Sequence, residues 1–69
     1  MQATIQAVQP YDLHGVRYYA LRYLVDGDQQ LQEARVSHDM VYPDPQPGDR
    51  VDVRAILGIV DRVIKVEVT

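Results

Sequence analysis

Residues 47–68 read PGDRVDVRAILGIVDRVIKVEV, and this stretch decides the class of fold. It opens with the turn residues Pro47-Gly48-Asp49, continues with apolar residues at alternate positions, and is interrupted by Gly58 before the alternation resumes. Successive side chains of a strand point to opposite sides, so a period of two is typical of a strand with one apolar and one polar face. The stretch therefore predicts a β-hairpin.

A turn at Gly58-Ile59 gives this hairpin a register that suits both of its faces. Apolar residues then meet across the inner face, and residues of opposite charge meet across the outer face. The expected pairs are Val51–Val66, Val53–Ile64 and Leu57–Val60 inside, and Asp52–Lys65 and Arg50–Glu67 outside. Arg62 and Val63 do not fit, because Arg62 falls inside and Val63 outside, and a bulge or a longer loop that includes Asp61 would correct both.

A second hairpin is predicted upstream. Residues 16–25 are rich in tyrosine, which suits a pleated surface, and Gly27-Asp28 is a two-residue turn of the Gly-X kind. The expected pairs are Leu21–Ala34, Tyr19–Val36 and Tyr23–Gln32 on the core side, and Arg22–Glu33 and Leu24–Leu31 on the other side. A leading strand is expected at residues 3–9, ended by Pro10 because proline has no N–H for a central ladder.

The two hairpins are joined by residues 37–46, in which prolines predict an extended crossover. Ser37 can cap at most one short helical turn near residues 37–41. Five strands arranged in this way would leave long bare edges, and closure into a small barrel removes them. We therefore expect one all-β domain over residues 1–69: a small five-stranded barrel, OB-like or, as the alternative, SH3-like.

Composition excludes several classes of function. A chain of 69 residues has a small stability margin, and the absence of cysteine excludes disulfides, thiolate nucleophiles and cysteine-based zinc sites. The formal net charge of −3 disfavours a generic nucleic-acid binder, although six of the seven basic residues are arginine. The N-terminus lacks the pattern of a signal peptide and no apolar run has the length of a membrane helix, so we expect a soluble cytoplasmic protein without a membrane partner.

Residues 33–68 resemble the closing half of RNA-binding OB domains, in the motif Ala34-Arg35-Val36-Ser37 and in residues 47–53. The chain also resembles short bacterial β-domains of unknown function that carry a Tyr-rich strand, a Val-Asp-Gly turn and a late Gly-Asp strand. The OB resemblance implies a ligand face on the second and third strands, where aromatic residues stack on bases and basic residues contact phosphates. The candidates for such a face are Tyr18, Arg22 and Arg35, with Arg17 near the start of the strand.

Enzymatic chemistry has little support in the sequence. No phosphate-binding loop, nucleophile elbow or pair of catalytic carboxylates is present, so we expect no enzyme and no cofactor. His14 and His38 lie in predicted loops with no third ligand at a suitable spacing, which predicts solvent-exposed histidines and no metal site. A small enzyme built on His38 and Asp39 is a third possibility, and it requires a pocket around them.

Tyr18, Leu24 and Leu31 are expected to face outward, and together they would form an exposed apolar patch. The alternative is that the barrel curls over this face and covers it. The patch predicts a non-enzymatic binding or oligomerisation module that acts through protein–protein contacts, including those of a homo-oligomer. The alternative function is a single-stranded nucleic-acid-binding domain that uses Tyr18, Arg22 and Arg35.

Overall fold

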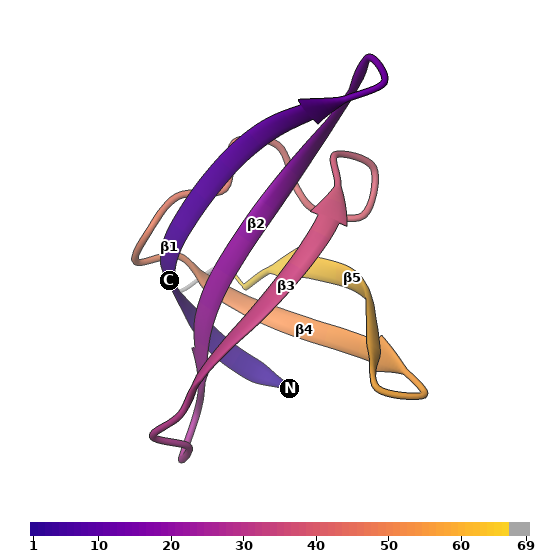
Figure 1. Cartoon of the computed structure of the whole chain (residues 1–69). Helices are drawn as coiled ribbons and strands as arrows, with labels where there is room; N and C mark the ends of the chain where they lie inside the picture. Colours follow the sequence, from indigo (N-terminus) through magenta and orange to yellow (C-terminus); the bar gives the residue numbers. More distant parts are fainter. Residues whose placement is uncertain (67–69) are drawn as a thin grey trace.

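Five antiparallel strands make up the fold in the computed structural model, which describes residues 1–66. They are β1 (Gln2–Leu13), β2 (Val16–Val25), β3 (Leu31–Ser37), β4 (Arg50–Ile56) and β5 (Ile59–Lys65). Their order in the single sheet is β3-β2-β1-β4-β5 (Figure 1). Three consecutive strands followed by a fourth that returns beside the first form a Greek key, which in a five-stranded, partly open sheet is the OB-like arrangement. The all-β prediction is confirmed.

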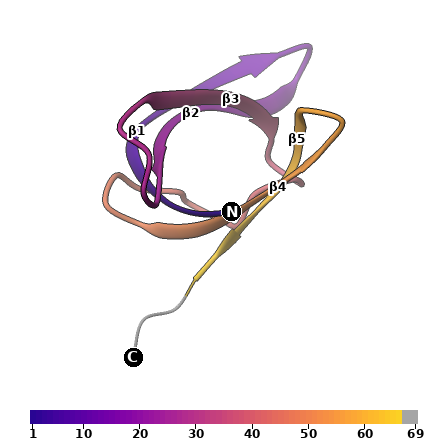
Figure 2. The same ribbon diagram turned by 90° about the horizontal axis from the view of Figure 1, so that it is seen from below.

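The sheet curls round on itself without closing, as the end-on view shows (Figure 2). Its two edge strands, β3 and β5, share no ladder. One isolated parallel bridge joins Val41, just after β3, to Val63 in β5, and the Val63 amide donates to the Met40 carbonyl at 2.8 Å. The predicted barrel is therefore approximate: it is an open, strongly curved sheet.

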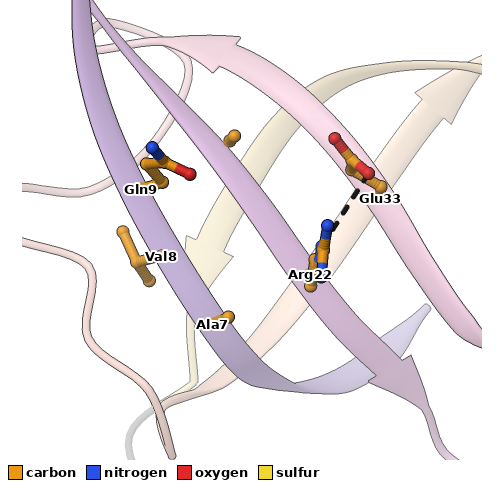
Figure 3. Close-up of a pocket in the computed structure, with 6 residues that line it drawn as sticks. Ala7, Val8, Gln9, Arg22 and Glu33 are labelled. Carbon is orange, nitrogen blue, oxygen red and sulfur yellow. Dashed lines mark ion pairs between the residues drawn. The ribbon is translucent and has the colours of Figure 1, made fainter.

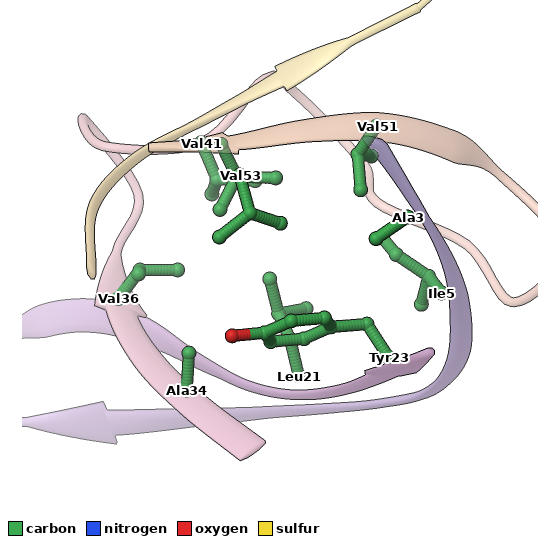
Figure 4. Close-up of a cluster of buried hydrophobic side chains, with 10 residues drawn as sticks. Ala3, Ile5, Leu21, Tyr23, Ala34, Val36, Val41, Val51 and Val53 are labelled. Atoms are coloured by element: carbon green, nitrogen blue, oxygen red, sulfur yellow. The ribbon is translucent and has the colours of Figure 1, made fainter. Parts of the chain in front are cut away.

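The core fills the inside of this curve with ten apolar side chains (Figure 4). They come from every strand and from the crossover: Ala3, Ile5, Leu21, Tyr23, Ala34, Val36, Val41, Val51, Val53 and Val63. Tyr19 is partly buried and packs against this cluster, and Tyr23 is only 5% exposed, as expected for the core side of β2. Burial raises the pKa of Tyr23, because it disfavours the charged phenolate.

Strand β1 does not end at Gln9 as predicted; it continues through Pro10 to Leu13. The chain reverses at His14 and Gly15, which both have positive φ, in the tight turn that two-residue hairpins favour. Leu13 and Val16 flank this turn as a pair, so Pro10, three residues earlier, directs its nitrogen away from β2. The missing N–H of Pro10 therefore costs no ladder bond, because β4 pairs with β1 only from Gln2 to Thr4.

The register of the β2–β3 hairpin is confirmed at every predicted pair. Its turn differs from the prediction, because the Asp28 amide donates to the Val25 carbonyl at 2.9 Å and so centres the turn on Asp26 and Gly27. The connection then runs on to Gln30, whose amide donates to Asp28 Oδ1 at 3.0 Å. Cross-strand pairing resumes at Leu24 and Leu31.

The predicted register of the β4–β5 hairpin is wrong. The turn lies at Leu57-Gly58, where both residues have positive φ, and not at Gly58-Ile59. The register then shifts next to Arg54, and Asp61 is the extra residue, as the suggested bulge required. The observed pairs are Ile56–Ile59, Ala55–Val60, Arg54–Arg62, Val53–Val63, Asp52–Ile64 and Val51–Lys65. Val63 consequently enters the core and Arg62 faces solvent.

The new register also changes the ion pairs. Asp52 lies opposite Ile64 and cannot meet Lys65; its carboxylate accepts from the Met1 amine at 2.8 Å and from Arg54 Nε at 3.3 Å. The predicted partner of Arg50, Glu67, lies outside the described residues. Arg50 instead makes a bidentate pair with Asp26, with both N–O distances 2.6 Å. The hydrogen bonds from Arg50 hold the pKa of the Asp26 carboxyl below its usual range. This pair ties the β2–β3 loop to β4.

The crossover between β3 and β4 forms turns, and residues 1–66 contain no helix. The Met40 amide donates to the Ser37 carbonyl at 2.9 Å in the segment where at most one short helical turn was expected. Further along, Tyr42 Oη donates to Asp49 Oδ2 at 2.7 Å, and this bond lowers the pKa of Asp49. None of the described residues forms a helix that could cross a membrane.

Candidate binding surface

The outer face of β1, β2 and β3 contains all the residues proposed for binding except Arg17. Side chains alternate along β2, and its even-numbered residues point away from the core. Cross-strand pairing places their neighbours from β1 and β3 beside them. The rows across this face are Tyr11–Tyr18–Ser37, Gln9–Ala20–Arg35, Ala7–Arg22–Glu33 and Thr4–Leu24–Leu31.

An aromatic pair occupies one end of this face. Tyr11 lies opposite Tyr18, and their rings stack with centroids 5.6 Å apart and an interplanar angle of 16°. Both side chains are half-buried, since each covers one face of the other. Tyr11 is not among the predicted site residues, because the prediction ended the strand before Pro10.

The middle of the face carries charge. Glu33 lies between two arginines, with its carboxylate 3.9 Å from Arg22 Nε and 3.8 Å from Arg35 Nε. Both distances exceed that of a hydrogen bond, and the arginine side chains are 59% and 72% exposed. The predicted Arg22–Glu33 pair therefore forms only as a loose ion pair, which leaves the guanidinium donors available.

Arg17 does not join this group. It lies on the opposite face of β2, where its Nε is 2.6 Å from Asp12 Oδ1. This hydrogen bond lowers the pKa of the Asp12 carboxyl and raises the pKa of Arg17. Of the four residues that the OB resemblance implies, the structure brings together Tyr18, Arg22 and Arg35.

A shallow hollow of about 300 Å³ lies between β1 and β2 on this face (Figure 3). Ala7 and Ala20 supply its floor because their side chains are short, while Gln9, Arg22 and Glu33 rise around it. A neighbouring hollow shares Gln9 and Ala20 and extends towards Tyr11 and Arg35. Together they link the tyrosine pair to the charged middle.

An apolar pair occupies the other end of the face. Leu24 lies opposite Leu31, and Leu31 is 52% exposed, so the sheet does not cover it. Tyr18 is six positions from Leu24 along β2, which is roughly 20 Å in a strand. The residues of the predicted patch therefore share a face but lie at opposite ends of it, with the arginines between them.

A second exposed apolar group lies at the turn of the β4–β5 hairpin. Ile56, Leu57 and Ile59 are 64%, 97% and 73% exposed, and we call these three side chains the apolar tip. Arg54 and Arg62 face each other directly behind it. The tip was not predicted, although residues 55–57 are three consecutive apolar residues, and such a run cannot keep every side chain on the inner face.

The histidines lie apart from these surfaces. His14 is exposed at the β1–β2 turn, and His38 is exposed after β3. Asp39 accepts a hydrogen bond from Ser37 Oγ, which lowers its pKa, but the hollow beside Asp39 does not include His38 among its lining residues. Residues 1–66 contain no group of three His, Asp or Glu side chains that could hold a metal ion.

Comparisons with family models, with curated proteins and with solved structures give no match for this chain. Function is therefore inferred from the surfaces themselves, because a fold alone does not imply an activity.

Proposed function

We propose that the chain is a non-enzymatic binding module that contacts protein, including further copies of itself, through the outer face of β2 and β3. The observation that carries this proposal is the Leu24–Leu31 pair, in which Leu31 keeps half of its surface in water. When a partner removes an exposed apolar side chain from water, the free energy of the system falls, which favours binding.

The size of the domain supports the same function. A chain of this length buries a limited share of its surface, and seven of its ten core side chains are alanine or valine. Association with a partner adds buried area and stabilises the folded state by mass action. A partner that covers the exposed Leu31 would therefore stabilise this small open sheet.

Sedimentation velocity from low micromolar to near-millimolar concentration tests this proposal. We expect the wild-type chain to self-associate, and Leu31→Glu to weaken that association by about tenfold or more, because a charge replaces a side chain that the partner buries. Leu13→Glu is the matched control, since Leu13 is 50% exposed but lies at the β1–β2 turn. A wild-type chain that stays monomeric throughout contradicts self-association.

Binding of single-stranded nucleic acid is the second candidate, and one specific observation favours it. Tyr18, Arg22 and Arg35 lie on one face, where Arg22 and Arg35 line two neighbouring hollows, and the two guanidinium groups hold Glu33 only loosely. Such groups stack on bases and contact phosphates. The net charge of −3 opposes this function, which is why it ranks second.

Titration of a fluorescently labelled single-stranded oligonucleotide at low salt tests the second candidate. We expect affinity that falls as salt rises, and that Arg22→Gln with Arg35→Gln reduces by about tenfold or more. Arg54→Gln is the control, because Arg54 is similarly exposed and lies on β4. Absence of binding at low salt eliminates the candidate, since the electrostatic attraction is strongest there.

A further inference from the structure

We propose that copies of this chain associate head to tail, with the apolar tip of one copy seated on the Leu24–Leu31 pair of the next. This inference rests on the proposed function and deepens it, because it identifies the partner and the second half of the contact. The two surfaces belong to different hairpins and lie on different parts of the sheet (Figure 1).

The apolar tip protrudes from the sheet, and residues 1–66 leave its three side chains largely exposed. Leu57 is 97% exposed and has a φ of 53°, a left-handed conformation that is unfavourable for leucine. Ile56 and Ile59 pair beside it and are also largely exposed. A contact that buries all three side chains removes more apolar surface from water than the burial of any one core side chain does.

The charge around the tip selects the partner. Arg54 and Arg62 lie opposite each other behind it, and like charges in that position repel. Among residues 1–66, Arg62 forms no ion pair and Arg54 reaches only Asp52, at 3.3 Å. Two tips that met symmetrically would bring four arginines together, so charge disfavours a tip-to-tip dimer.

The remainder of the chain has the complementary charge. The whole sequence has a net charge of −3 although it includes Arg54 and Arg62 behind the tip, so the remaining residues are acidic in sum. The Leu24–Leu31 pair is one of the apolar sites in that remainder, and its Leu31 is 52% exposed; Leu13 and Val16 form another at the β1–β2 turn. Asp28 precedes Leu31 in the β2–β3 loop, and its carboxylate only caps the Gln30 amide. The apolar tip with the two arginines behind it therefore complements the Leu24–Leu31 pair and Asp28 of a second copy.

A contact between two different surfaces is heterologous, so the copy that supplies the tip keeps its Leu24–Leu31 pair free, and the copy that receives the tip keeps its own tip free. Such contacts generate a ring if the rotation between copies closes, and an open chain if it does not. This property separates the proposal from a symmetric dimer, which would consume the same surface on both copies.

Two variants that each lack one surface test the proposal when they are mixed. Leu57→Asp places a charge in the apolar tip. The substitution does not strain the turn, because aspartate tolerates positive φ better than leucine does. Leu31→Glu removes the receiving surface. We expect each variant alone to be monomeric under conditions in which the wild-type chain associates, and the equimolar mixture to form a dimer and nothing larger, by sedimentation velocity and light scattering.

The outcomes are distinct. A mixture that remains monomeric overturns the head-to-tail contact. If Leu31→Glu abolishes association and Leu57→Asp leaves it unchanged, the proposed function stands and the role of the tip is rejected; if the wild-type chain never associates, both fall. Arg54→Glu combined with Arg62→Glu should weaken association by about tenfold or more, and added salt should weaken it in the wild-type chain. Leu13→Asp is the control for an added acidic group.

Discussion

Leu57 combines an unfavourable backbone conformation with almost complete exposure of its apolar side chain. It occupies the first left-handed position of the β4–β5 turn, followed by Gly58 in the second. Asparagine and aspartate are the usual residues before glycine in such a turn, because their short polar side chains tolerate positive φ. In an isolated copy, a leucine at position 57 therefore contributes no buried contact that would offset the strain of its backbone.

Leu57→Asn should stabilise the isolated domain by about 0.5–1.5 kcal/mol, because it relieves the left-handed strain without removing a buried contact. Denaturant unfolding of dilute protein measures this difference. Ile56→Asn is the control, since Ile56 is also exposed but has ordinary strand geometry, and it should give no gain. A lower unfolding midpoint for Leu57→Asn than for the wild type would show that the tip packs inside its own chain.

The alternation of apolar and polar residues predicts the register of the β2–β3 hairpin but not that of the β4–β5 hairpin. In the β2–β3 hairpin, apolar and charged pairs agree on one register, and the observed loop preserves it despite a different turn. In the β4–β5 hairpin, the extra residue Asp61 shifts every pair beyond the bulge. As a result Val63 takes the core position that the period-two pattern assigns to Ile64.

Val63→Ala should destabilise the domain by about 1.5–2.5 kcal/mol, because it removes two methyl groups from a side chain that is only 2% exposed and leaves a cavity. Ile64→Ala removes more atoms from a side chain that is 37% exposed, and it should cost less. Thermal or denaturant unfolding of both variants provides the comparison. The reverse order of stability would support the original register and count against the bulge.

The whole molecule is an open curved sheet with its exposed apolar groups at separate places. Within residues 1–66, the isolated bridge between Val41 and Val63 joins the chain after β3 to β5 across the opening, and the Arg50–Asp26 pair joins β4 to the β2–β3 loop. Leu31 faces outward from the curved sheet and Leu57 lies in a hairpin turn, so both side chains remain exposed to water. Head-to-tail association uses both, so the proposed assembly would bury apolar surface that the fold of a single copy leaves exposed.

The sequence by itself determined the all-β class, the positions of four of the five strands, the β2–β3 register and the outward direction of Tyr18, Arg22, Arg35 and Leu31. These features are local, because alternation and turn residues act over a few positions. Only the tertiary structure decided that β1 extends past Pro10, which brings Tyr11 onto Tyr18, that β1 pairs with β4, and that the β4–β5 turn at Leu57-Gly58 leaves the tip exposed. Those outcomes depend on which strand edges meet and where a ladder slips, and residues distant in sequence decide both.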